Sequence, residues 1–424
     1  MTARFRGVKV RQAGPSISAM SSFEVPDAKR SGADVMFHGH RFLLRAGLAI
    51  GNVFAWIFVF DYFVGLSGSV ARAFAGVLIM YALSQAITVM LTPVAAAHLR
   101  RGTRSALVWA LLLSASAFVI LGATLGGLFN GTESALWGIA AFAIFLGAYR
   151  ALYFIPYELN RANTEGARPR DRLFYELLLA LVPAFAGATL LTETYAPVKL
   201  LFGAAAFSVI AALPVLFIPN IHERFSFSYA ETFRGLFTRR NNRILRISFL
   251  EGAQGAALLL VWPLAVFLIV GGSYATLGIV FSVTLLCILL IRIIHRNLVP
   301  EFRRQRSLST HVTFAVSGWV ARFVTGSALG VIIADAYAYS THPVRGTSVD
   351  PFVFEQSADA GSFIDEYTAL KEIGLAIGRI SFAVIIGTFV FLAPIIVAFA
   401  IALLLAAVSA GISVSLARRH EAAQ

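Results

Sequence analysis

The second half of this 424-residue chain repeats the first half in the order and spacing of its apolar segments. Trp56 and Trp262 are each followed by a glycine nine residues later. The basic segment 99–104 (LRRGTR) follows the second apolar segment of the first half, and 302–307 (FRRQRS) follows the corresponding segment of the second half. Because the shifts between such pairs stay close to one value, the pattern predicts a duplicated unit.

The amino-acid composition indicates whether the duplicated unit is soluble or spans a membrane. Hydrophobic residues make up 58% of the chain and charged residues 13%, and the mean hydropathy is +0.77. The apolar residues form blocks of about 20, the length that spans a bilayer as a helix, so a soluble globule is excluded. We expect an all-α membrane protein of twelve transmembrane helices in two pseudo-two-fold-related six-helix bundles. The expected spans are 42–66, 70–95, 105–129, 134–157, 172–193, 197–219, 244–270, 274–295, 308–325, 328–352, 366–389 and 391–416.

These spans divide the chain into five expected parts. They are an N-terminal tail (1–41), a first bundle (42–219), a linker (220–243), a second bundle (244–416) and a C-terminal tail (417–424). Most of the 35 Lys and Arg residues lie in the tails and in the connections on one side of the membrane. This asymmetry predicts that both termini are cytoplasmic in a multi-pass protein of the plasma (bacterial inner) membrane.

The net charge of +13 would favour nucleic acid only if it covered a soluble face. The charges instead lie between apolar spans, so the expected partners are anionic membrane lipids and not nucleic acid. In the linker, Phe233, Leu236 and Phe237 share one helical face, with arginines elsewhere. This predicts an amphipathic helix at the membrane surface.

The order of spans and the basic turn after span two resemble the major facilitator superfamily. The family pattern in that turn is G-x-x-x-D-R-x-G-R-[RK], and its places are occupied here by Ala95, Leu99, Arg100, Gly102, Thr103 and Arg104. The Arg, the Gly and the last basic residue match, whereas the first Gly and the Asp are replaced. The resemblance implies alternating access by rocking of two bundles, a cavity lined by spans one, four, seven and ten, and a monomer.

Two arginines inside spans are the first candidates for solute binding. Arg150 and Arg345 each precede a proline by six residues, at equivalent places in spans four and ten. A charge at the bilayer centre costs about 2.5–3.5 kcal/mol on insertion scales, so such residues are candidates for function. Two guanidinium groups facing one cavity would clamp a carboxylate or phosphate, with Tyr149 and Tyr153 adding hydroxyl donors. Alternatively, each arginine pairs with a carboxylate or extends to the cytoplasmic surface.

Span ten carries further polar residues on one helical face, at Asp335, Tyr339 and His342. Histidine titrates near neutrality, and Asp335 can share a proton with it, which predicts a proton-coupling path. The alternative is that Asp335 lies in the outer half and pairs with Arg322.

Spans one and seven supply the remaining candidates. Arg45 and Glu251 occupy equivalent positions with opposite charges, which predicts a gating lock between the halves at the cytoplasmic mouth. The expected solute contacts of these spans are Asn52, Trp56, Gln254 and Trp262, with packing as the alternative for both tryptophans.

Carboxylates and cations at the cytoplasmic ends are interpreted as structural charge networks, comprising Glu176, Lys371, Glu372 and Arg379. Pro183 and Gly187 in span five permit close approach of another helix.

The sequence therefore predicts a secondary transporter that moves a small, anionic or polar organic solute, driven by a proton or solute gradient. It holds no phosphate-binding loop, metal-binding motif or nucleophile elbow, so no cofactor, metal or enzymatic activity is expected. Three alternatives remain. The first is an exporter of hydrophobic compounds or lipids, with the buried arginines as counter-ions. The others are a polytopic membrane enzyme and a transporter-like receptor.

Overall fold

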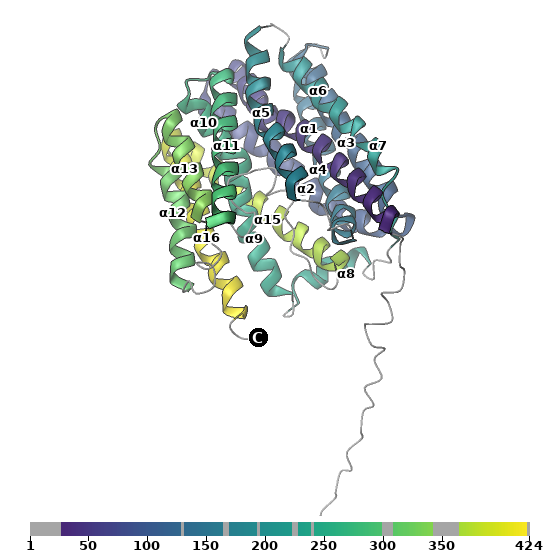
Figure 1. Cartoon of the computed structure of the whole chain (residues 1–424). Coiled ribbons are helices and arrows are strands. Elements are labelled where there is room, and N and C mark those ends of the chain that lie inside the picture. Colours follow the sequence, from purple (N-terminus) through teal and green to yellow (C-terminus); the bar gives the residue numbers. More distant parts are fainter. Residues whose placement is uncertain are drawn as a thin grey trace, which may run out of the picture.

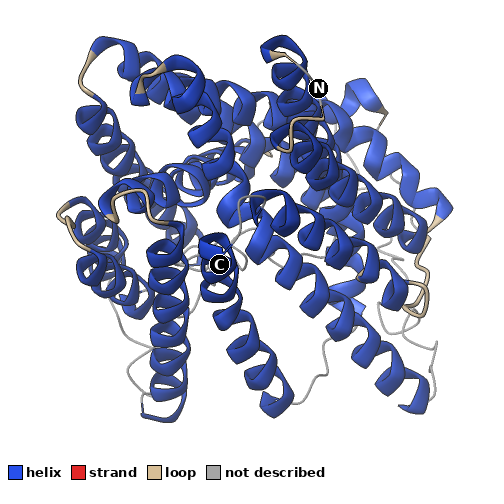
Figure 2. Ribbon diagram, turned by 90° about the horizontal axis from the view of Figure 1, so that it is seen from above, coloured by secondary structure: helices blue, strands red, loops and turns tan. Residues whose placement is uncertain are grey.

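The computed structural model describes residues 27–128, 131–163, 169–192, 196–222, 228–238, 241–298, 308–341 and 364–421. Within these ranges the chain forms helices joined by short connections, and no strand (Figures 1 and 2). Ten of the described helical segments are long and apolar enough to cross a membrane. The predicted all-helical class is confirmed, whereas the full count of twelve spans remains a prediction.

The described residues of the first half form seven α-helices. They are α1 (Asp27–Ser67), α2 (Val70–His98), α3 (Thr103–Leu125), α4 (Thr132–Asn163), α5 (Pro169–Thr192), α6 (Ala196–Ile210) and α7 (Ala212–Val215), with a 3-10 turn, η2 (Leu99–Arg101), after α2. Helix α1 begins before residue 42, where the sequence placed the end of the tail. Phe37 and His40 are buried, because this extension packs its apolar face on the bundle.

The linker contains a short helix, α8 (Tyr229–Leu236). A capping box starts it, in which the Ser228 side chain accepts from the Glu231 backbone N–H and the Glu231 carboxylate accepts from the Ser228 backbone N–H. Leu236 is buried and packs with Leu370 and Ile373 of the following half, while Phe237 is exposed. The apolar face of the predicted amphipathic helix is therefore partly covered by protein.

The described residues of the second half form eight helical elements. They are α9 (Asn242–Ala256), the π-helical segment η3 (Ala257–Val261), α10 (Trp262–Ile269), α11 (Tyr274–Leu298), α12 (Leu308–Phe323), α13 (Ala328–Thr341), α15 (Ile364–Leu392) and α16 (Ile395–Glu421). Helices α9, η3 and α10 form one span. Pro263 has no N–H and would clash with the carbonyl of Leu259, so the span widens into a π turn just before it.

Helix pairings recur between the halves. In the first half, α3 packs on α4, α2 on α4, α3 on α6 and α1 on α6. In the second half, α12 packs on α13, α11 on α13, α12 on α16 and α9 on α16. A duplicated unit produces such a recurrence, because the same apolar faces find the same neighbours. The domain boundaries proposed from the sequence remain a prediction.

The two halves meet along a seam formed mainly by α5 with α11 and by α2 with α15. At the first pair, a Cβ on Gly278 would lie 2.2 Å from the carbonyl oxygen of Pro183. The Ala184 backbone N–H donates to Ser282 Oγ at 2.8 Å. Small residues and a proline thus bring α5 and α11 close together, as helices pack inside membranes.

The first turn of α1, helix α8 and the end of α16 lie at the same end of the bundle, which is the lower end in Figure 1. Helix α1 runs from there to the opposite, upper end, where it ends at Ser67. The beginning of α11 lies at that end too, because Tyr274 contacts Asp61 of α1. These two ends serve below to locate polar groups along the seam.

Candidate functional site

At the upper end, a tyrosine and a carboxylate join the halves. Tyr274 Oη of α11 donates a hydrogen bond to Asp61 Oδ2 of α1 at 3.0 Å. The Tyr274 ring also lies 5.4 Å from the ring of Phe58 and 4.9 Å from that of Phe267, between centroids. This upper contact holds α1 of the first half against α10 and α11 of the second.

A second polar group surrounds α2 in the middle of the seam. Tyr81 and Gln85 lie one turn apart on one face of α2. The Arg150 guanidinium of α4 lies 6.0 Å from the centre of the Tyr81 ring, and Arg379 Nη1 of α15 donates to Gln85 Oε1 at 3.2 Å. All four side chains are buried. We call these residues, Tyr81, Gln85, Arg150 and Arg379, the α2 cluster.

The residues of the α2 cluster lie near the middle of the helices that carry them. Tyr81 and Gln85 are near the middle of α2, which has 29 residues, and Arg379 is near the middle of α15, which also has 29. Arg150 is close to the midpoint of the 32-residue α4. At about 1.5 Å per residue, these positions fall within the roughly 30 Å hydrocarbon layer.

The predicted tyrosines of α4 form a stack beside this cluster. The Tyr153 ring lies 5.4 Å from the Tyr149 ring and 5.3 Å from the Tyr157 ring. His40 Nε2 is 3.1 Å from Tyr153 Oη, and His40 Nδ1 is 2.9 Å from the Ala211 carbonyl oxygen. Since that carbonyl only accepts, Nδ1 carries the proton and Nε2 accepts from Tyr153. The Tyr153 hydroxyl is therefore directed to α1.

A third polar group lies towards the lower end of the seam, between α1, α5 and α11. Arg292 of α11 forms an ion pair with Glu176 of α5, and its Nε donates to Tyr339 Oη of α13 at 2.6 Å. Glu176, Arg292 and Arg45 of α1 line one small pocket with a volume of about 40 Å³. This volume has room for a few water molecules. We call Arg45, Glu176, Arg292 and Tyr339 the lower cluster.

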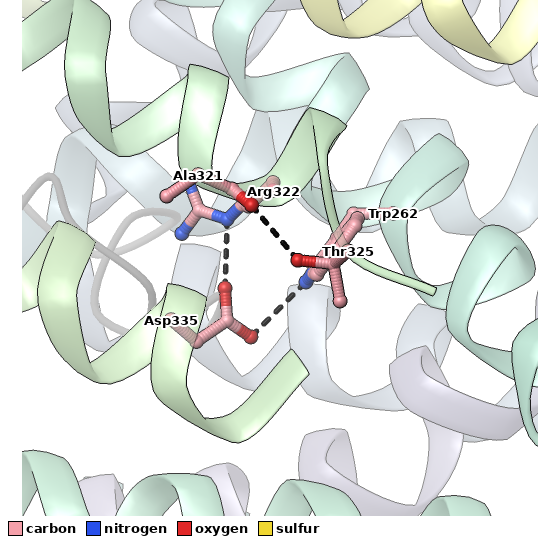
Figure 3. A network of polar contacts seen from close by, with 5 residues as sticks. All are labelled: Trp262, Ala321, Arg322, Thr325 and Asp335. Atoms are coloured by element: carbon pink, nitrogen blue, oxygen red, sulfur yellow. Dashed lines mark hydrogen bonds and ion pairs between the residues drawn. The ribbon is translucent and has the colours of Figure 1, made fainter. Parts of the chain in front are cut away.

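Asp335 and Trp262 belong to a separate network inside the second half (Figure 3). Arg322 Nε donates to Asp335 Oδ1 at 2.7 Å, and Trp262 Nε1 donates to Asp335 Oδ2 at 3.0 Å. The Arg322 guanidinium also lies 4.7 Å from the Trp319 ring centre. This arrangement matches the alternative in which Asp335 pairs with Arg322. Tyr339, expected on the same proton path, instead contacts Arg292.

The other predicted residues are spread over the helices. Trp56 is buried, with its ring 5.6 Å from the Tyr81 ring and 5.3 Å from the Phe142 ring. Gln254 Nε2 donates to Ser413 Oγ at 3.2 Å. Asn52 and Glu251 are half-buried. Arg345 and His342 lie outside the described residues.

Three residues that connect the two halves were not identified from the sequence. Arg292 and Gln85 are single polar residues inside apolar runs, a signal that was available and not used. Arg379 was interpreted as part of a structural network at the cytoplasmic end, yet it is buried in the middle of α15. Periodicity could not show that it lies against Gln85, because the two residues come from opposite halves.

No protein-family model and no curated protein sequence matches the chain. Its structure is similar to that of the human organic anion transporter MFSD10, at 15% identity and a TM-score of 0.55, covering 92% of this chain and 100% of that one. It is also similar to the xylose transporter XylE from E. coli, at 11% identity and a TM-score of 0.58, covering 90% and 97%. A peptide transporter, POT, matches at 14% identity and a TM-score of 0.58, covering 94% and 96%.

The apolar helices and these likenesses define a multi-pass helical membrane protein. The chain shares the fold of these three transporters, which confirms the predicted resemblance at the level of the fold.

Proposed function

We propose that this protein is a secondary transporter that moves a small polar or anionic organic solute by alternating access. The observation that carries the proposal is the seam of a transporter fold in which buried charged side chains from both halves converge. Arg150 and Arg379 approach α2 from opposite halves, and Glu176 pairs with Arg292 across the seam. Charges placed so deep are expensive to bury and are typical of solute and ion pathways.

The contacts at the two ends of the seam would act as gates. The Tyr274–Asp61 hydrogen bond closes the upper end, and the Glu176–Arg292 ion pair closes the lower end. If the halves rock about the α2 cluster, breaking one contact opens a path to one side while the other contact persists. The predicted Arg45–Glu251 lock would belong to the lower gate.

The distribution of basic residues indicates which gate faces the cytoplasm. The basic connections predict that the lower end faces the cytoplasm of a plasma membrane. In this proposal the driving gradient is carried by protons through Asp335, Tyr339 and His342. Protonation of Asp335 would weaken its pairing with Arg322 and loosen α12 from α13. The predicted solute contacts remain Arg150 and Arg345, with Tyr149, Tyr153, Asn52, Trp56, Gln254 and Trp262 around them.

Cross-linking tests alternating access without knowledge of the solute. In a Cys287→Ser background, cysteine pairs D61C/Y274C and E176C/R292C would be bridged with a short bis-maleimide at the upper or lower gate. The reporter Ala49→Cys lies in the lower pocket. Bridging the upper gate should increase labelling of the reporter from the lower side, and bridging the lower gate should suppress it. Equal labelling in both states would contradict the proposal.

The arginine clamp has its own test in proteoliposomes. Uptake of labelled succinate, benzoate and phosphate would be compared between the wild type and the R150Q/R345Q variant, with membrane insertion verified. The proposal expects saturable uptake of at least one anion and its loss in the variant, because a guanidinium fork holds carboxylate or phosphate. Unchanged uptake would remove the clamp.

A second candidate function is export of hydrophobic compounds. The Arg322–Asp335 pair favours it, because that buried arginine serves as an internal counter-ion. Extrusion of an apolar fluorescent dye that persists in R150Q/R345Q, with no anion uptake by the wild type, would select this candidate.

A further inference from the structure

Arg379 differs from the other buried cations of the seam in its partner. Among the described residues, its polar contact is with Gln85 Oε1, a neutral amide oxygen, at 3.2 Å. Among the described residues, no carboxylate pairs with Arg379, and its Nε has no hydrogen-bond partner. Its exposed fraction is 2%. The described protein groups thus leave the charge of this buried guanidinium uncompensated and one of its donors without an acceptor.

Arg322 provides a matched comparison within the same half. It is buried to a similar degree, at 4% exposure, yet it has Asp335 at 2.7 Å as its counter-charge. Burial of a charge without an opposite partner destabilises a protein, since desolvation is not offset by attraction. Within the part of the chain that the structure describes, a carboxylate supplies this offset at Arg322 and none does at Arg379, which favours a site for an external anion at Arg379.

The surroundings of Arg379 suit such an anion. Tyr81 lies one turn before Gln85 in α2. Its side chain is fully buried, and its Oη has no hydrogen-bond partner among the described residues. The Arg150 guanidinium lies over the Tyr81 ring. Two guanidinium groups from opposite halves and a phenolic donor therefore lie against consecutive turns of α2, near the middle of the membrane.

We propose that Arg379, Tyr81 and Arg150 form the anion subsite of the transporter, for a small organic solute that bears a carboxylate or phosphate. The planar fork of Arg379 matches two oxygens of such a group, and Tyr81 Oη donates to one of them. Gln85 occupies the fork when the anion is absent. This subsite rests on the proposed function and replaces Arg345 by Arg379 as the cation contributed by the second half.

The side chains of the α2 cluster are covered, because α15 packs on both α2 and α4. An anion reaches them only when α15 moves away from one of these helices. Binding at Arg379 thereby requires the same separation of the halves that alternating access provides, and the bound anion would draw the two guanidinium groups together again.

Thermal unfolding of the purified protein in detergent gives a test that does not need the natural solute. Replacing Arg379 with Gln removes an uncompensated charge, so R379Q without ligand should unfold at a higher temperature than the wild type. The Q85L variant is the control, because it removes the hydrogen bond and retains the charge, and it should unfold at a lower temperature. If the only role of Arg379 is its hydrogen bond to Gln85, the unfolding temperatures of R379Q and Q85L should both fall below that of the wild type. This result would overturn the proposal.

The second test measures whether small anions bind to the protein and raise its unfolding temperature. Succinate, benzoate and inorganic phosphate would be compared with the neutral analogues succinamide and benzamide. At least one anion should stabilise the wild type, its neutral analogue should not, and its apparent Kd should weaken about ten- to a hundredfold in R379Q. R379K, which retains charge without the fork, should recover part of the affinity. Absence of any anion effect, or an equal effect in R379Q, overturns the subsite.

Further measurements separate a lipid ligand from a soluble anion, and failure of the subsite from failure of the transporter proposal. Arg379-dependent stabilisation by phosphatidylglycerol in nanodiscs, with none by soluble anions, would make a lipid headgroup the ligand and overturn the solute subsite. Reciprocal gate labelling with unchanged anion binding in R379Q would retain the transporter and reject only this subsite. Failure of the gate labelling itself would reject the transporter.

Discussion

Trp56 and Trp262 occupy equivalent positions in the two halves, yet their surroundings differ in kind. Trp56 packs edge-on against the rings of Tyr81 and Phe142. Trp262 donates its indole N–H to Asp335, which also pairs with Arg322. One half thus holds its tryptophan by aromatic packing, and the other holds it by a hydrogen bond to the carboxylate of a buried ion pair.

The difference has a physical consequence. Aromatic packing is tolerant, because losing one ring leaves neighbours that can move into the space. An ion pair in a water-poor interior is intolerant, because losing one partner leaves a charge with no compensation. We therefore expect the second half to be the more sensitive to single substitutions and the one with the more strictly defined geometry.

The largest effect should follow Asp335→Asn, which leaves Arg322 buried without its counter-charge. The expected loss is about 3–5 kcal/mol of unfolding free energy, measured by unfolding in mixed micelles. The double variant R322M/D335L should recover most of that loss, since buried ion pairs can be replaced by apolar residues of similar volume. A D335N variant as stable as the wild type would show that the pair contributes little.

Substitution of each tryptophan tests the difference between the two halves directly. Trp262→Phe removes a hydrogen bond to a charged acceptor and should cost about 1.5–3 kcal/mol. Trp56→Phe removes ring area without a polar contact and should cost less than about 1.5 kcal/mol. Unfolding of the two variants under identical conditions checks the order. Equal losses would mean that packing dominates in both halves.

The smallest effect concerns an exposed carboxylate, in contrast to buried Asp335. The backbone N–H of Ser228 donates to Glu231 and lowers the pKa of that carboxylate below its usual value of 4.5. A lowered pKa in the folded state means that the cap stabilises α8 above pH 4.5 and that this contribution is lost as pH falls through the folded-state pKa. Glu231→Gln should abolish the pH dependence of the hydrogen-exchange protection factors in α8 between about pH 5 and pH 3. An unchanged pH dependence would assign it to another group.

Much of the architecture was readable in the sequence because membrane spans obey strict rules of length and apolarity. Apolar blocks of about 20 residues located the helices, and isolated charges such as Arg150 and Asp335 were correctly expected inside them. The pairing of Asp335 with Arg322 was open as an alternative, since both residues lie close to one short turn.

Contacts between the halves were not readable in the same way. Arg379 with Gln85 and Glu176 with Arg292 join residues that are far apart in the sequence, and no periodic pattern relates them. The duplication relates Arg150 to Arg345 and Arg45 to Glu251, and both pairings remain predictions. Among the described residues, the structure places Arg150 and Arg379 beside α2, and Arg45 beside Glu176 and Arg292, which the duplication does not indicate.

The sequence by itself determined a helical membrane protein with a duplicated order of spans, because hydrocarbon accepts only chain segments that satisfy their own backbone hydrogen bonds. The tertiary structure alone decided which buried charges meet. Pairing across the seam depends on the relative rotation and height of packed helices, which are set by small residues and prolines such as Gly278 and Pro183, and not by the hydrophobicity of any one span.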